Sequence, residues 1–254
     1  MPVPAGLRRV ATTRYVTPLR EGGSLPGLVE ADDDGLYVVK FRGAGQGPRV
    51  LAAEVIVGEL ARALGLPVPE LVLADVDPAL GRAEPDPEIQ ELIEASAGTN
   101  LGVDFLPAAL PYTPAAGWQP DPALAADIVW LDALTTNVDR TAQNPNLLLW
   151  HGRLWLIDHG AALYRQHTGL DPADAARPFA PIAKHVLLPI AGSIVEADAR
   201  LAPRVDRVLL ERLVGLVPVD WLAGTEPQAY VDYLAGRLAR SRAIAQEAED
   251  ARGA

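Results

Sequence analysis

The chain has 254 residues, no cysteine and a formal net charge of −11. The length suits one large domain or two small lobes, and the lack of cysteine excludes disulfides, thiolate zinc sites and a cysteine nucleophile. The acidic charge argues against general nucleic-acid binding, because proteins that bind along a phosphate backbone carry a basic excess. No apolar run reaches the ~18 residues that a membrane helix needs, and the N-terminal sequence has no signal-peptide core, so we expect a cytoplasmic protein without a membrane segment.

The first part of the chain is predicted to be rich in strands. Weak alternation over residues 10–15 indicates one strand. Residues 28–30 and 36–42 have the pattern of a hairpin around the acidic turn ADDDG. Within the second hairpin strand, Lys40 shares a face with two apolar residues.

Three elements are expected next, in this order: a helix over 49–64, a strand over 71–76, and a short helix or loop over 88–95. The segment SAGTNLG, residues 96–102, has the composition of a flexible connector. We therefore place a boundary after residue 97, which gives two domains, 1–97 and 98–254.

The second half is predicted to be mostly helical. Asp121 is expected to cap a helix over 122–136, with a proline in its first turn. A polar loop and a hairpin of two short strands, 147–150 and 154–157, come next. The remaining helices, with a frayed end after residue 247, are expected around 181–195, 203–216 and 227–248. Strands before helices indicate an α+β fold.

The densest polar cluster, NVDRTAQN over 137–144, lies between an apolar helix and a hairpin that ends in IDHG. Phosphoryl transfer needs a carboxylate to accept or orient the proton of the attacking hydroxyl, and oxygen ligands for Mg²⁺. Asp139, Asn144 and Asp158 have these chemistries, and D-x-x-x-x-N is the spacing of a kinase catalytic loop. Each piece alone is common in ordinary loops, but their ordered combination favours a catalytic site.

Lys40 is a candidate partner of nucleotide phosphates, because a half-buried strand lysine needs an anion. By helical angle Glu54 borders the apolar face of its helix whereas Glu59 points away, so Glu54 is the residue that could hold Lys40 in place. A lysine that extends to water and a solvated glutamate are the competing interpretations.

Together these segments resemble the HipA-like kinase family, a branch of the protein-kinase-like fold. The matching strings, spread over most of the chain, are EGGSLPGLVEADDDGLYVVKF, LGLPVP, TNLGVDFLP, NVDRTAQN and LWLIDHGAAL. The resemblance implies a two-lobed α+β fold with a small, sheet-rich, ATP-binding N-lobe and a larger helical C-lobe. Since the chain begins close to the nucleotide loop, the N-terminal subdomain of longer family members is expected to be absent.

The resemblance implies ATP and Mg²⁺ as cofactors. Lys40 would contact the α- and β-phosphates. Gly22, Gly23 and Ser24 would lie over the phosphates, and a glycine turn does offer backbone amides to an anion, although the motif also fits a plain turn.

The segment 98–104, which contains Asn100 and Gly102, would form the hinge beside the adenine. Asp139 would be the base, and the metal ligands would be Asn144 and Asp158. The acceptor would be a Ser or Thr hydroxyl on a protein or on the kinase itself. Two alternatives stay open: a small-molecule kinase, since an acidic second lobe suits a cationic acceptor, and a nucleotide-binding pseudokinase that acts through a partner.

Overall fold

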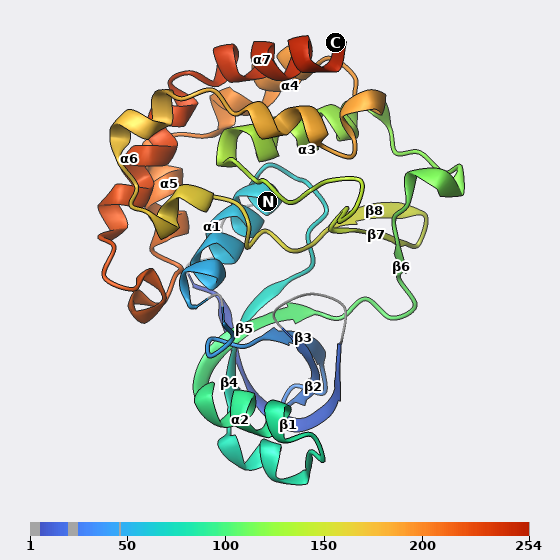
Figure 1. Ribbon diagram of the computed structural model, residues 1–254, viewed down its shortest axis with the longest axis vertical. Helices are drawn as coiled ribbons and strands as arrows, with labels where there is room; N and C mark the ends of the chain where they lie inside the picture. Colours follow the sequence, from blue (N-terminus) through green and yellow to red (C-terminus); the bar gives the residue numbers. More distant parts are fainter. Residues whose placement is uncertain (1–5, 20–24, 46, 254) are drawn as a thin grey trace.

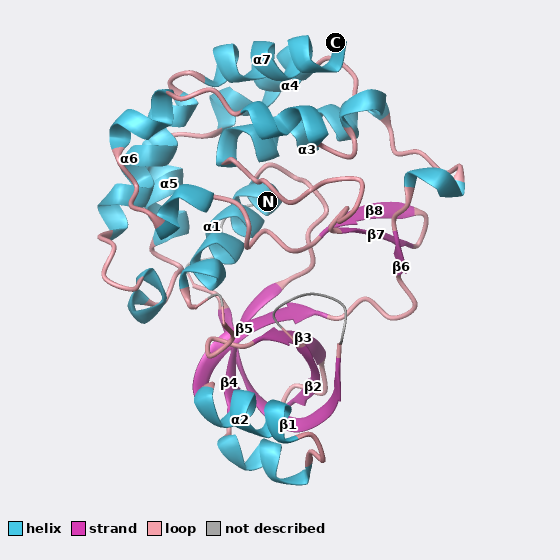
Figure 2. Cartoon of the chain, in the orientation of Figure 1, coloured by secondary structure: helices cyan, strands magenta, loops and turns pink. Residues whose placement is uncertain are grey.

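The computed structural model describes residues 6–19, 25–45 and 47–253. A closed barrel has the strand order β1-β2-β3-β5-β4, in which β4 also pairs with β1 in parallel and the other neighbours are antiparallel. Its strands are β1 (Arg8–Pro18), β2 (Gly27–Ala31), β3 (Leu36–Lys40), β4 (Leu71–Val76) and β5 (Gly98–Asp104). The barrel lies at one end of the molecule and most helices lie at the other (Figures 1 and 2). The α+β class expected from the sequence is confirmed.

Alternating apolar side chains set the register of the β2–β3 hairpin, which the sequence predicted. Val29 lies opposite Tyr37, and both are buried in the barrel interior. The chain reverses at the acidic turn, where Asp34 has a φ of 62°, a left-handed conformation that aspartate tolerates better than most residues. Since successive side chains of a strand point to opposite faces, Lys40 lies on the outer face of β3.

Strand β5 shows that the expected flexible connector over residues 96–102 is wrong. Residues 98–104 pair with β3 on one side and with β4 on the other. Gly102 has no room for a side chain, because an added Cβ would lie 2.7 Å from Cγ2 of Val72. Gly102 therefore serves close packing within a sheet, and the proposed division after residue 97 cuts through the barrel.

Helix α1 (Arg49–Ala63) lies between the barrel and the other helices (Figure 1). Every residue from 51 to 61 is buried, so the helix is covered on all sides and not on one apolar face alone. Its charged residues therefore need internal partners. Glu59, which was expected to point away from the core, is buried and pairs with Nε of Arg62 at 3.2 Å. Glu54 is buried in the same helix.

The helical part is organised around α3 (Pro122–Thr135). Asp121 caps it as expected, since its carboxylate accepts a hydrogen bond from the backbone N–H of Ala123 at 2.7 Å. The other helices are α4 (Ile194–Leu201), α5 (Arg207–Val214), α6 (Pro227–Leu238) and α7 (Ser241–Gly253). The short helix α2 (Pro87–Ala95) lies on the barrel, where Ile89 and Ile93 join its core.

Two helical predictions for the second half are wrong. The stretch 181–195 is not one helix, because Pro181 and Pro189 lie in separate 3-10 turns and proline cannot continue the helical hydrogen-bond ladder. The stretch 227–248 is divided into α6 and α7. The 3-10 turns are Pro78–Ala83, Pro114–Ala116, Tyr164–His167, Pro172–Ala176, Ala180–Lys184, Leu188–Ile190, Ala202–Arg204 and Val219–Leu222.

The end of the chain is also more ordered than expected. Helix α7 continues to Gly253, and the carboxylate of Glu249 accepts a hydrogen bond from the backbone N–H of Ile194 at 2.7 Å. This contact caps α4 and holds the two helices together. Among the described helices, none combines the length and the apolar character that a membrane span requires.

A second sheet carries the residues that follow the polar loop. Its strands, in the order β6-β7-β8, are β6 (Leu110–Pro111), β7 (Leu147–Trp150) and β8 (Arg153–Leu156). The predicted β7–β8 hairpin is confirmed, with Leu147 and Leu156 opposite each other and buried. Strand β8 ends two residues before Asp158.

Candidate active site

Lys40 lies at the centre of an ionic cluster that joins three distant segments. Its Nζ donates to a carboxylate oxygen of Glu54 on α1, and to Oδ1 of Asp158 after β8 at 2.7 Å. The Lys40 and Glu54 side chains are 13% and 2% exposed, whereas that of Asp158 is 47% exposed. Asp158 is therefore the member of this cluster that solvent and a ligand can reach.

Glu54 also fixes the backbone beside Asp158. Its Oε2 accepts a hydrogen bond from the N–H of His159 at 2.8 Å, and its Oε1 accepts one from the N–H of Gly160 at 2.9 Å. A side chain at Gly160 would not fit, because an added Cβ would lie 2.4 Å from Cγ1 of Val50 and 3.0 Å from Oε1 of Glu54. Glycine at this position thus permits the close approach of α1.

Opposite charges and burial determine the protonation of this cluster. The positive charge of Lys40 holds the pKa of the Asp158 carboxyl well below its usual range. Burial lowers the pKa of Lys40, but the charges of Glu54 and Asp158 outweigh this effect and raise it. Burial raises the pKa of Glu54. At neutral pH the cluster therefore presents a charged lysine and a charged, partly exposed Asp158.

Asp139 is held by amides of its own loop. Its Oδ2 accepts hydrogen bonds from Nδ2 of Asn144 at 2.7 Å and from Nδ2 of Asn146 at 3.2 Å. The backbone N–H of Asp139 donates to the side-chain oxygen of Asn137 at 3.1 Å. These contacts orient the Asp139 carboxylate, which lies at the edge of the loop.

One backbone and one side-chain hydrogen bond, both made by Asn146, bring Asp139 and Asp158 into one region. The N–H of Ile157, the residue before Asp158, donates to the carbonyl of Asn146 at 3.1 Å. Asn146 in turn donates its side-chain amide to Asp139. The two carboxylates are thus linked through a short chain of neighbours, although 19 positions separate them in the sequence.

A fully buried cluster that the sequence analysis missed holds the polar loop to α3. Asp132 on α3 accepts hydrogen bonds from Nε of Arg140 at 2.5 Å, from Nε2 of His185 at 3.0 Å and from Nδ2 of Asn137 at 3.1 Å. Burial raises the pKa of Asp132, but the charge of Arg140 and the bond from His185 outweigh it and hold the pKa well below its usual range. The sequence feature that could have revealed this cluster is Asp132, a charged residue inside the apolar run IVWLDAL.

Arg140 ties this cluster to the end of the β7–β8 hairpin. Its Nη1 donates to the carbonyls of Asn146 at 2.5 Å and Ile157 at 3.3 Å, and its Nη2 donates to Nδ1 of His159 at 3.4 Å. His159 is buried, and burial together with the nearby arginine lowers its pKa to about 3. Because Nδ1 accepts from Arg140, the proton of the neutral imidazole lies on Nε2.

The predicted hinge residues Asn100 and Gly102 lie on β5, on either side of Leu101, which pairs with Lys40 on β3. The side chain of Asn100, buried in β5, donates to the carbonyls of Ser96 at 2.7 Å and Gly98 at 2.8 Å and accepts from the N–H of Arg42 at 2.8 Å. Gly102 is paired inside the barrel. These contacts hold both residues within the barrel, and their place beside the adenine stays a prediction.

The turn Gly22-Gly23-Ser24 lies outside the described residues.

The side chains that the structure brings together are therefore Lys40, Glu54 and Asp158, with Asp139 and Asn144 on the adjoining loop. This arrangement can bind a polyanion at the lysine, hold a cation at the exposed carboxylate and accept a proton at the loop aspartate. A cationic group, a metal-binding carboxylate and a base side by side are the requirements of phosphoryl transfer.

Comparisons with known proteins agree with this chemistry. Residues 13–239 match the HipA-like kinase family. The structure is similar to the crystal structure of the Helicobacter pylori proinflammatory kinase CtkA, with a TM-score of 0.57 and 13% identity over 95% of this chain and 98% of that one. It is also similar to the Golgi casein kinase, with a TM-score of 0.50 and 14% identity over 98% of this chain and 75% of that one. No curated protein matches. The family match spans most of the chain, the two structures share its kinase-like fold, and the protein therefore belongs to the HipA-like kinases and is a kinase.

Proposed function

We propose that this kinase uses Mg-ATP and transfers the γ-phosphoryl group to a Ser or Thr hydroxyl on a protein or on itself. The observation that carries the proposal is the contact of Lys40 with Glu54 and with the partly exposed Asp158. A lysine fixed by a helix glutamate and facing a metal-binding aspartate is the arrangement in which protein kinases hold ATP.

The donor atoms fit a magnesium nucleotide. Asp158 offers an accessible carboxylate. Asn144 donates a hydrogen bond to Asp139 from its side-chain nitrogen, and among the described residues its side-chain oxygen accepts none. Magnesium in kinases is held by one or two such oxygens together with the nucleotide phosphates, not by a cage made of protein alone. Asp158 and Asn144 would hold the ion, and when bound it neutralises charge on the phosphates.

Each residue then has a definite task. Lys40 binds the α- and β-phosphates, and Glu54 keeps the ammonium group directed at them. Asp139 receives or orients the proton of the acceptor hydroxyl, and its two amide partners keep the carboxylate pointed in one direction. Gly22, Gly23 and Ser24 remain candidates for contacts with the phosphates.

A covalent probe tests the nucleotide site directly, because the chain contains only two lysines, Lys40 and Lys184. An acyl-phosphate derivative of ATP acylates a lysine beside the phosphates. We expect mass spectrometry to find Lys40 labelled in the presence of Mg²⁺, with protection by excess ATP. Lys184, which is exposed on a 3-10 turn, serves as the internal control. Equal labelling of both lysines, or no protection by ATP, would contradict the proposal.

The acceptor requires a separate measurement. Incubation with γ-labelled ATP should label the kinase or an added protein on Ser or Thr, and the label should depend on Asp139. Transfer to sugars or aminoglycosides in place of protein would assign the small-molecule activity. ATP binding without transfer to any acceptor would assign a pseudokinase.

A further inference from the structure

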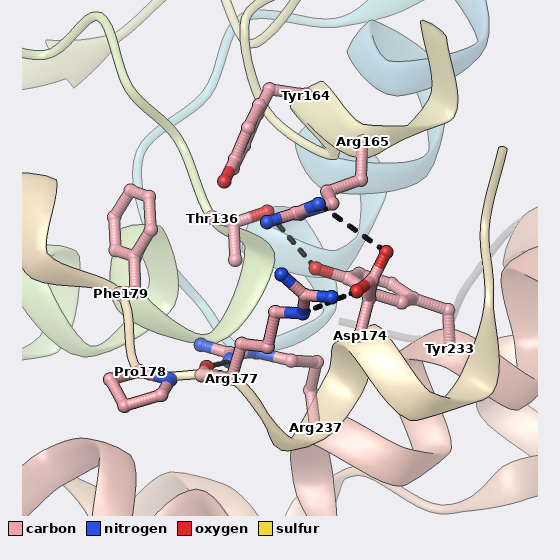
Figure 3. Close-up of a pocket in the computed structure, with 9 residues that line it drawn as sticks. All are labelled: Thr136, Tyr164, Arg165, Asp174, Arg177, Pro178, Phe179, Tyr233 and Arg237. Atoms are coloured by element: carbon pink, nitrogen blue, oxygen red, sulfur yellow. Dashed lines mark hydrogen bonds and ion pairs between the residues drawn. The ribbon is translucent and has the colours of Figure 1, made fainter. Parts of the chain in front are cut away.

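A small pocket is lined by residues that do not belong to the lysine cluster (Figure 3). It is a shallow depression, partly open to solvent. Its lining residues come from the end of α3, from the segment 164–179 and from α6. They are Thr136, Tyr164, Arg165, Asp174, Arg177, Pro178, Phe179, Tyr233 and Arg237.

Positive charge predominates in this pocket. Three guanidinium groups line it, and Asp174 is the one carboxylate among the lining residues. Asp174 is shared, since Nη1 of Arg165 lies 3.4 Å from one of its oxygens and Nε of Arg177 lies 2.6 Å from the other. In a chain with a net charge of −11, this local excess of arginine is a specific feature and not an effect of composition.

Arg237 contributes a charge that no carboxylate neutralises by contact. It is 1% exposed, and its N–H groups donate to carbonyls: Nη2 to that of Ala133 at 2.7 Å, Nε to that of Leu134 at 3.2 Å, and Nη1 to that of Arg177 at 2.8 Å. A buried cation that is held only by carbonyl dipoles keeps its full charge at the floor of the pocket. An anion bound above it would complete the charge balance.

The other two arginines are accessible to a ligand. The side chains of Arg165 and Arg177 are 27% and 64% exposed. The Arg165 guanidinium lies 5.5 Å from the ring centroid of Tyr164, which restricts its position. In Figure 3 the guanidinium groups of Arg165 and Arg177 and the hydroxyl of Thr136 face the same space.

The pocket lies close to the proposed base. Thr136 ends α3 in a left-handed conformation, with a φ of 56°. It precedes Asp139 by three residues, so their Cα atoms are at most about 11 Å apart. The segment 164–179 begins six residues after Asp158. A short peptide whose hydroxyl lies at Asp139 can therefore place a neighbouring side chain in the pocket.

From these observations we propose that the pocket binds an anionic side chain, a carboxylate or a phosphate monoester, of a polypeptide acceptor, near the hydroxyl that receives the phosphoryl group. Guanidinium groups match both anions because their paired N–H donors fit two oxygens. The inference rests on the proposed protein kinase function and specifies its substrate class. It also runs against the cationic acceptor that the acidic composition suggested, since the local charge near the base is positive.

The test is the binding of fluorescent peptides measured by anisotropy. Three sets have the same randomised neutral positions around one Ser and differ in one flanking residue, which is Glu, phosphoserine or Gln. We expect the wild-type protein to bind at least one anionic set about tenfold or more tightly than the Gln set, as expected for hydrogen bonds to a charged group. The double variant Arg165→Gln/Arg177→Gln should lose this preference.

Two further variants separate an anion site from a structural role. Asp174→Asn removes the pocket's own anion and should tighten the binding of the anionic set several-fold. Arg200→Gln, which removes an exposed arginine paired with Asp127 on another surface, should leave the preference intact. Thermal unfolding of all variants reports on folding.

The peptide-binding results test the pocket, and they can be told apart from the results that test the proposed function. If the wild-type protein binds the three sets equally, or if the double variant keeps the preference while folded, the inference is overturned. A preference for Glu over phosphoserine assigns an acidic acceptor, and the reverse assigns a phosphorylated one. ATP labelling of Lys40 in the same preparations reports on the kinase site, so failure of one does not imply failure of the other.

Discussion

The molecule contains two ionic clusters that differ in access to solvent. In the first, Lys40 bridges Glu54 and Asp158, whose side chain is 47% exposed. In the second, Asp132 and Arg140 are both fully buried, and the carboxylate already accepts three hydrogen bonds. The pKa of the aspartate is held low in both clusters. A perturbed pKa therefore does not identify a ligand site here, whereas an accessible charge with capacity for a further partner does.

The substitutions with the largest expected effect act on the accessible carboxylates. Asp139→Asn should lower the turnover number about 10²–10⁴-fold, the usual contribution of a general base. Asp158→Asn should lower it by a comparable factor because it removes a proposed metal ligand. Single-turnover transfer from labelled ATP measures the rate, and urea unfolding checks that the fold persists. Near-normal turnover in both variants would refute the site.

Substitutions in the buried cluster should lower the stability of the fold, whereas those at the accessible carboxylates should lower turnover. Arg140→Met leaves Asp132 buried without its cation, a change that typically costs about 3–5 kcal/mol. Urea unfolding gives the free energy. Lys40→Met is the matched control: Asp158 is partly solvated and Glu54 keeps two backbone donors, so this variant should retain more stability while losing ATP binding. If Lys40→Met were the less stable of the two, the comparison between the clusters would fail.

A pH titration examines His159, which contacts both clusters. The folded protein keeps this imidazole neutral down to a pKa of about 3, whereas the unfolded chain binds a proton below about 6.5. The unfolded state thus holds more protons between these values, so stability falls as pH falls. From pH 7 to pH 5 the free energy of unfolding should drop by about 2 kcal/mol from this residue.

The variant His159→Gln should remove that part of the pH dependence, and His167→Gln, an exposed control, should not. Urea unfolding at both pH values measures the difference. The same slope in both variants would show that other groups dominate.

The smallest expected effect comes from an exposed carboxylate outside both clusters. Asp121→Ala removes the cap of α3 and should cost about 1 kcal/mol. Its phosphoryl-transfer rate should stay at the wild-type level. A large loss of activity would mean that the position of α3 affects the loop beyond its stability, which stopped-flow transfer assays would detect.

Local patterns were sufficient to predict the hairpin with Lys40, the helix that carries Glu54 and the loop with Asp139, because periodicity and turn residues act over a few positions. The second cluster could not be predicted as a cluster, since Asp132 and His185 are 53 positions apart. Strand β5 was missed because Gly102 is explained by close packing against Val72, which no local pattern reveals. Tertiary contacts also determine the burial of Glu59, which pairs with Arg62 although its helical angle predicted that it points away from the core.

The closed barrel limits how this kinase can engage other proteins. In the described strands β1 pairs with β4 over residues 8–11 and with β2 over residues 12–18, so no strand of the five-stranded ring is an edge strand along its whole length. A partner peptide therefore finds no full-length free edge in the described strands for strand addition, which is a common mode of peptide recognition. Association through this end of the molecule must instead use side chains, the covering helix α2 or the connecting loops.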